Sequence, residues 1–208
     1  MSNLQLKRSL FPSVIVLLLS VTASAEPSTH DLSPQELVRD TSSRMLAALR
    51  DERQVIAENP GRLYELVSDI VLPYFDFQKM IQWVLGKNWR RATPEQRTRF
   101  VEQFRNLLIR TYGTALSDYA DEKIIYLPFN DAGDQRKVTV RTEIEQGGST
   151  IPIFYSMYNS EQGWKVYDVA ISGVSLVTNY RSTFTSIIRS EGMDNLIDQL
   201  VERNSAVQ

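Results

Sequence analysis

Hydrophobic positions repeat with a helical period up to about residue 119 and with a strand period after it. In the segment 61–71, apolar residues follow the i, i+3, i+4, i+7, i+8 spacing of one helix face: Leu63, Leu66, Val67, Ile70 and Val71. From 94 to 118 the apolar residues again form one wide face, and most charged residues lie opposite it. The pattern predicts helices over 33–58, 61–71, 76–85 and 94–118.

The ends of these helices carry recognisable signals. Ser33-Pro34-Gln35-Glu36 and Thr93-Pro94-Glu95-Gln96 each have a capping hydroxyl, a proline at the first helical position and an acid or amide at the third. We expect Pro73 to end the second helix, Asp76 to cap the third, and Gly86 to end it.

Beyond residue 119 apolar and polar side chains alternate, most clearly over 137–144. We predict four strands, over 123–128, 137–144, 151–158 and 164–171, joined by short turns into an antiparallel meander. Helices follow over 176–189 and 194–202. Helices, then strands, then helices indicate an α+β fold.

The N-terminus has the layout of an export signal. Lys7 and Arg8 precede an apolar run over 10–21, and Ala23-Ser24-Ala25 follows. We interpret residues 1–25 as a cleaved signal peptide. The run is shorter than the roughly 20 apolar residues of a membrane span, which disfavours the alternative of an uncleaved anchor. The rest, 26–208, is expected to be one domain, helical over 33–119, with the sheet over 123–174 and C-terminal helices over 176–203.

Composition removes several function classes. The chain has no cysteine, which excludes disulfides, thiol catalysis and cysteine-ligated metals. Its one histidine, His30, lies in the expected N-terminal tail, so we expect no histidine-built catalytic or metal site. A formal net charge of −2 gives no support for nucleic-acid binding.

The remaining candidates for chemistry are carboxylates and a basic cluster. Asp76, Asp118 or Asp168 would act as a base if it lay in an apolar pocket that raised its pKa. The alternatives are a helix cap, a solvated helix end and a paired charge, respectively. The cluster of Arg90, Arg91 and Arg97 is either a solvated helix entrance or a docking patch for anionic headgroups or an acidic partner.

The stretch 72–119 is rich in aromatic residues among aliphatic ones. Each buried aromatic side chain removes on the order of 150–250 Å² from water. A packed core is the default explanation for such faces, and the alternative is a wall around an apolar ligand. The residue pattern leaves both open.

Five segments resemble the MlaC family, also called the toluene-tolerance auxiliary family, which supplies the periplasmic phospholipid-binding component of the Mla (maintenance of lipid asymmetry) system. They are LPYFDFQKM, VLGKNWRRATPEQRTRFVEQFRNLL, RTYGTALSDY, WKVYDVAISGVSLVTNYRSTF and EGMDNLIDQL. The most specific pieces are Leu85-Gly86 with Trp89 before Ala92-Thr93-Pro94, the Thr111-Tyr112-Gly113 step, and Tyr167-Asp168 before Gly173-Val174-Ser175. The resemblance covers nearly all of the expected mature chain.

The resemblance implies an NTF2-like fold, with a curved antiparallel four-stranded sheet enclosed by several helices around an apolar pocket. It implies a periplasmic carrier that buries acyl chains and leaves the headgroup outside. Such a carrier moves phospholipid between an outer-membrane lipoprotein–porin complex and an inner-membrane ABC transporter with a periplasmic substrate-binding ring, which maintains outer-membrane lipid asymmetry. We expect a monomer without catalytic groups, metal or cofactor.

Tyr112 matches a tyrosine of the family's pocket. By the direction their elements face, nine further residues are predicted to contact lipid: Leu85, Trp89, Phe104, Leu108, Val140, Tyr155, Val166, Val169 and Tyr180. Arg90, Arg91 and Arg97 are candidates for partner docking. Two other functions stay open: an NTF2-like isomerase or dehydratase that uses a buried carboxylate, and a periplasmic chaperone or adaptor with an exposed apolar groove.

Overall fold

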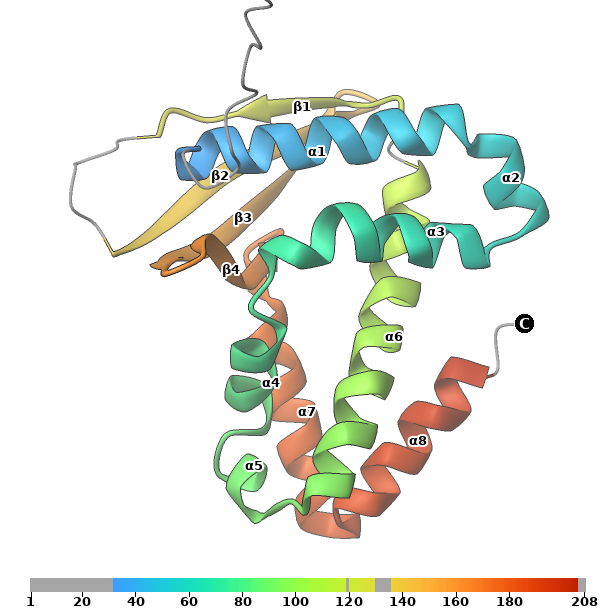
Figure 1. Cartoon of the computed structure of the whole chain (residues 1–208), viewed down its shortest axis with the longest axis vertical. Coiled ribbons are helices and arrows are strands. Elements are labelled where there is room, and N and C mark those ends of the chain that lie inside the picture. The colour runs from blue at the N-terminus through green and yellow to red at the C-terminus, as the bar shows by residue number, and fades with distance from the viewer. Residues whose placement is uncertain (1–31, 119, 130–135, 206–208) are drawn as a thin grey trace, which may run out of the picture.

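A computed structural model describes residues 32–118, 120–129 and 136–205 (Figure 1), with the backbone alone for 114–118. The predicted signal peptide, His30 and Tyr119 lie outside the described residues. In the described ranges no helix is both long enough and apolar enough to cross a membrane.

The described residues form an α+β structure, which confirms the predicted class. The helical elements are α1 (Pro34–Asp51), α2 (Arg53–Glu58), α3 (Gly61–Leu66), the π-helix η1 (Val67–Val71), the 3₁₀ helix η2 (Leu72–Tyr74), α4 (Phe77–Leu85), α5 (Lys87–Arg91), α6 (Pro94–Asp118), α7 (Leu176–Glu191) and α8 (Met193–Ser205). The strands are β1 (Lys123–Tyr126), β2 (Lys137–Gln146), β3 (Ser149–Ser160), β4 (Gly163–Ile171) and β5 (Val174–Ser175).

The sheet is an antiparallel meander in the order β1-β2-β3-β4-β5. The prediction of four strands was wrong, because the chain turns back after β4 and adds β5. Ser172 and Gly173 both have positive φ, 50° and 81°. A two-residue hairpin turn of this kind matches the twist of the strands it joins. The turn places Val174 and Ser175 opposite Ile171 and Ala170.

The helices form two groups (Figure 1). α1 lies against the sheet and α3 lies alongside α1, whereas α4 to α8 extend away from the sheet as a bundle. Within the bundle α6 packs on α8 and α4 packs on α7. Two separate clusters of buried side chains follow from this arrangement. The first joins the bundle to the sheet, and the second lies between the end of α1, α3, η1 and α6.

The predicted helix starts are confirmed. The Ser33 hydroxyl accepts from the Glu36 backbone, and Thr93 and Gln96 close a reciprocal pair of bonds at 3.0 and 3.2 Å. The prediction of one continuous helix over 33–58 was wrong, because the chain breaks at Glu52 into α1 and α2. The segment 61–71 leaves α-helical geometry after Leu66 and continues as η1. α5 was not predicted, since five residues are too few to show a period.

Asp76 joins the start of α4 to the sheet. One carboxylate oxygen accepts from the Lys79 backbone N–H at 2.9 Å, and the other accepts from the Tyr158 hydroxyl. Its own backbone N–H donates to the Val166 carbonyl at 2.8 Å. Asp76 is therefore both the predicted helix cap and a tie to β3 and β4.

We predict that Asp76→Ala lowers the free energy of unfolding by about 1–3 kcal/mol, because both side-chain bonds are lost. Asp76→Asn should cost less, since asparagine also caps helices. Urea denaturation measures both changes. Asp69→Ala, which removes an exposed carboxylate from η1, is the matched control. Equal stability of the Asp76→Ala and Asp69→Ala variants would show that the tie is unimportant.

Candidate functional site

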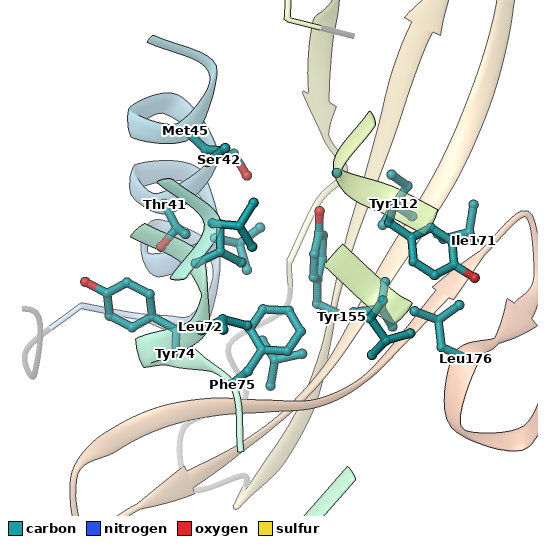
Figure 2. Close-up of a pocket in the computed structure, with 18 of the residues that line it drawn as sticks. Thr41, Ser42, Met45, Leu72, Tyr74, Phe75, Tyr112, Tyr155, Ile171 and Leu176 are labelled. Atoms are coloured by element: carbon teal, nitrogen blue, oxygen red, sulfur yellow. The ribbon is translucent and has the colours of Figure 1, made fainter. Parts of the chain in front are cut away.

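A cavity of about 590 Å³ lies between the helices and one face of the sheet. In Figure 2, Thr41, Ser42 and Met45 of α1, with Leu72, Tyr74 and Phe75, face Tyr112, Ile171 and Leu176 across the space, and Tyr155 stands between them. Protein pockets for small ligands have volumes of about 300–1,000 Å³. The cavity is thus large enough for an organic ligand.

The sheet forms the floor of the cavity. Side chains two residues apart share a strand face, and the antiparallel register then pairs them across strands. The lining pairs are Ile144 with Ile151, Thr142 with Ile153, Tyr155 with Val169, and Met157 with Val166. The alternation seen in the sequence therefore produces a continuous, mostly aliphatic surface.

The opposite wall comes from α1, η1, η2 and α6. Leu37, Val38, Thr41, Ser42 and Met45 of α1 line the cavity, as do Val67, Val71 and Leu72. The wall takes residues from both buried clusters, which do not merge. The cavity therefore occupies the gap between two cores.

Gly113 allows α6 to approach α3 closely. A Cβ atom at this position would lie 3.3 Å from Leu63 Cδ2, closer than side chains ordinarily approach. Close packing against Leu63 thus explains the glycine of the Thr111-Tyr112-Gly113 step. It lets Tyr112 face the cavity while the next residue contacts α3.

Two tyrosines of the wall, Tyr112 and Tyr155, have raised pKa values. Burial raises the pKa of Tyr155 to about 12. Burial, and then its contact with Tyr180, raises the pKa of Tyr112 to about 12. Arg105 is the one charged side chain among the described lining residues. The interior offers apolar surface and neutral hydroxyls, and it suits an apolar ligand or the apolar part of an amphiphile.

Five of the ten residues predicted to contact lipid line the cavity: Leu108, Tyr112, Tyr155, Val166 and Val169. The other five, Leu85, Trp89, Phe104, Val140 and Tyr180, do not. Phe104 stacks on Phe100 at 5.6 Å and meets Phe184 edge-on, inside the bundle. Leu85 and Val140 are also enclosed by packed neighbours.

Trp89 and Tyr180 lie outside the cavity wall because each packs against residues of the bundle. Trp89 is in α5, under the guanidinium of Arg97, whose carbon is 5.0 Å from the ring centroid. Tyr180 packs on Phe104 and Phe184 and forms a side-chain hydrogen bond with Tyr112. The apolar face of the bundle is thus core, whereas Leu108, one turn beyond Phe104 on α6, lines the cavity.

Sequence reasoning missed the contribution of α1 and of η1–η2. The spacing of Val38, Thr41, Ser42 and Met45 was present as a helix face, but Thr41 and Ser42 made it look interrupted. The Thr41 hydroxyl oxygen is buried and makes no hydrogen bond with a described residue. A polar side chain inside an otherwise apolar stripe was the signal that could have marked this face as a cavity wall.

Neither Asp76 nor Asp168 lies in the wall of this cavity, and the side chain of Asp118 lies outside the described residues. Asp168 accepts from the Ser175 hydroxyl at 2.6 Å and from the Val177 backbone N–H at 3.1 Å, so it holds the start of α7. In both residues each carboxylate oxygen has a structural partner.

The three arginines proposed for docking divide into two kinds. Arg90 and Arg91 are exposed on α5. Arg97 donates to the Trp89 carbonyl at 2.9 Å and to the Arg90 carbonyl at 3.4 Å. Because these bonds use Arg97 to hold α5 against α6, it is less available for a partner.

Comparison with known proteins gives a consistent picture. The family model described as "MlaC protein" matches residues 39–202. The intermembrane phospholipid transport system binding protein MlaC of Haemophilus influenzae is 25% identical over 209 residues, which cover 99% of this chain and 97% of that protein. Toluene tolerance protein ttg2D of Pseudomonas putida is 27% identical over 164 residues, 78% of this chain and 76% of that protein.

A solved structure is similar in both fold and sequence. It is a phospholipid-binding protein from Ralstonia solanacearum in complex with a phospholipid. The TM-score is 0.79 and the sequence identity is 32%, over 84% of this chain and 98% of that one.

We predict that Tyr155 makes the protein sensitive to alkali. Because its pKa is raised to about 12, the folded state holds the phenolic proton after the unfolded chain has lost it near pH 10. The stabilisation of the folded state by the protonated Tyr155 hydroxyl is complete below pH 10 and is lost as the pH rises from about 10 to about 12. Tyr155→Phe should flatten this part of the stability curve by on the order of 2 kcal/mol, measured by urea denaturation at each pH. Parallel curves for the two proteins would contradict burial of this hydroxyl.

Proposed function

Because this chain belongs to the MlaC family, we propose that it is a carrier that binds a phospholipid with its acyl chains inside the cavity. The observation that carries the proposal is the apolar cavity between the two cores, with a wall of aliphatic, aromatic and hydroxyl side chains. The similar Ralstonia solanacearum protein, whose structure contains a phospholipid, supports it.

The energetics favour a carrier of this design. Each CH₂ group moved from water into an apolar site contributes about 0.8 kcal/mol, so a lipid leaves a bilayer readily only for an interior of similar polarity. A wall of this composition makes the transfer nearly isoenergetic, and lipid can therefore enter and leave. Such transfer needs no catalytic group.

The carrier works in the periplasm after removal of residues 1–25, as one domain over 26–208 and as a monomer. It moves phospholipid between an outer-membrane lipoprotein–porin complex and an inner-membrane ABC transporter with its periplasmic ring. Arg90 and Arg91, exposed on α5, are the docking contacts that we favour. In this proposal the sheet and its helices form an NTF2-like fold.

The isomerase or dehydratase alternative is less well supported. It needs a carboxylate at an apolar site, and neither Asp76 nor Asp168 lines the cavity. Both carboxylates accept hydrogen bonds that hold helix starts. No described contact favours the chaperone alternative either, and we propose neither function.

The direct test is lipid extraction. The full-length chain, expressed and exported in a Gram-negative host, is purified without detergent, extracted with solvent and analysed by mass spectrometry. We expect phospholipid in a stoichiometric amount relative to protein. Folded protein that contains no phospholipid, and takes up none from vesicles, would contradict the carrier function.

Two substitutions test the placement of the lipid. We predict that Tyr112→Glu or Leu108→Asp reduces the phospholipid per protein by roughly tenfold or more, because a charge against acyl chains costs several kcal/mol. Mass spectrometry measures the loss, and circular dichroism establishes that the variants fold. Val55→Asp is the matched control, since Val55 is 49% exposed on α2 and outside the wall. Folded Tyr112 and Leu108 variants that retain normal lipid would show that this wall is misplaced.

A further inference from the structure

Arg105 has a position that the apolar cavity does not explain. It is the one charged side chain among the described residues that line the cavity, and it is exposed to solvent. An exposed arginine alone carries little information. An arginine at the rim of an otherwise uncharged wall differs, because it places a permanent positive charge where the apolar surface meets water.

The helix geometry aligns Arg105 with the lipid-facing residues. Positions 105, 108 and 112 are spaced i, i+3 and i+7, so they lie on one face of α6. At a rise of 1.5 Å per residue, Arg105 lies about 4–5 Å from Leu108 and about 10 Å from Tyr112 along the helix axis. The face is apolar at Leu108 and Tyr112 and cationic one turn away. This face is therefore complementary to an amphiphile that has an apolar part and one anionic group.

Arg105 also lacks the acidic partners that Arg62 and Arg99 have. Arg62 forms ion pairs with Glu52 and Glu65, and Arg99 pairs with Asp198 at 2.8 Å. Arg105 makes no ion pair with any described residue. Its guanidinium carbon instead lies 5.6 Å from the ring centroid of Phe77, which itself lines the cavity. The aromatic contact holds the charge at the rim and leaves its donors for another ligand.

We propose that Arg105 binds the phosphate of the lipid at the mouth of the cavity. The inference rests on the carrier function proposed above and adds a preference among the lipids that the carrier binds. A guanidinium matches a phosphate diester through two parallel N–H···O bonds, whereas a diacylglycerol with the same acyl chains offers no anion. Arg105 thus makes the carrier prefer lipids with a phosphate over neutral two-chain lipids, without contacting the variable part of the headgroup.

A competition experiment tests the selectivity. Full-length protein is incubated with an excess of equal amounts of dioleoylphosphatidylglycerol and dioleoylglycerol dispersed in detergent, then reisolated, and both lipids are quantified by mass spectrometry. We expect wild type to prefer the phospholipid. Arg105→Met should lower the ratio of phospholipid to diacylglycerol about tenfold, the effect of losing one charge-assisted contact. Arg105→Lys should retain part of the preference, since lysine keeps the charge without the paired donors.

Arg189→Met is the matched control, because it removes an exposed arginine from the last turn of α7, outside the cavity wall. Its ratio should equal that of wild type. A parallel calorimetric titration with inorganic phosphate alone separates a headgroup from a free anion as the ligand of Arg105.

The outcomes separate the two proposals. An Arg105→Met ratio equal to that of wild type, or an equal loss of both lipids, overturns the phosphate contact and leaves the carrier function in place. Phosphate binding that depends on Arg105, with lipid selectivity unchanged, overturns it in favour of a free anion. Wild-type protein that binds neither lipid refutes the carrier function itself.

Discussion

The structure depends on keeping an apolar space open inside a protein of this size. Protein interiors are otherwise packed as densely as organic crystals, and an unfilled apolar cavity lowers stability in proportion to its volume. Here the space lies between two buried clusters that are each well packed. α6 links them, because Phe100, Phe104 and Leu107 belong to the first and Ile109 to the second. This one helix thus contributes side chains to both cores.

The described residues of the cavity wall include one charged side chain, that of Arg105, because burying a charge is costly. A buried charge without a partner costs far more than a buried methylene contributes, so an apolar interior tolerates hydroxyls more readily than carboxylates. Burial keeps the hydroxyls of Tyr112 and Tyr155 protonated by raising their pKa values to about 12. The charge of Arg105 lies at the rim, where water still solvates it.

The carboxylates that suggested catalysis have a mechanical role instead. Asp76 holds the start of α4 to β3 and β4, and Asp168 holds the start of α7. These ties fix the bundle to the sheet at two points outside the cavity wall. A fold of this general class accommodates many functions, so the site decides among them. In this protein the site contains an apolar space and no carboxylate among its described lining residues.

The sequence by itself determined the local structure, because the signals for it are local. Capping residues at Ser33, Asp76 and Thr93 started helices where expected, and alternating residues formed strands. The same periodicity shows which face is buried but not what buries it. Phe104 and Leu108 lie one turn apart on α6, and Phe104 meets aromatic rings whereas Leu108 meets the cavity. Only the tertiary structure decided this, because the distance between the two cores depends on contacts between segments far apart in the chain, such as Gly113 against Leu63.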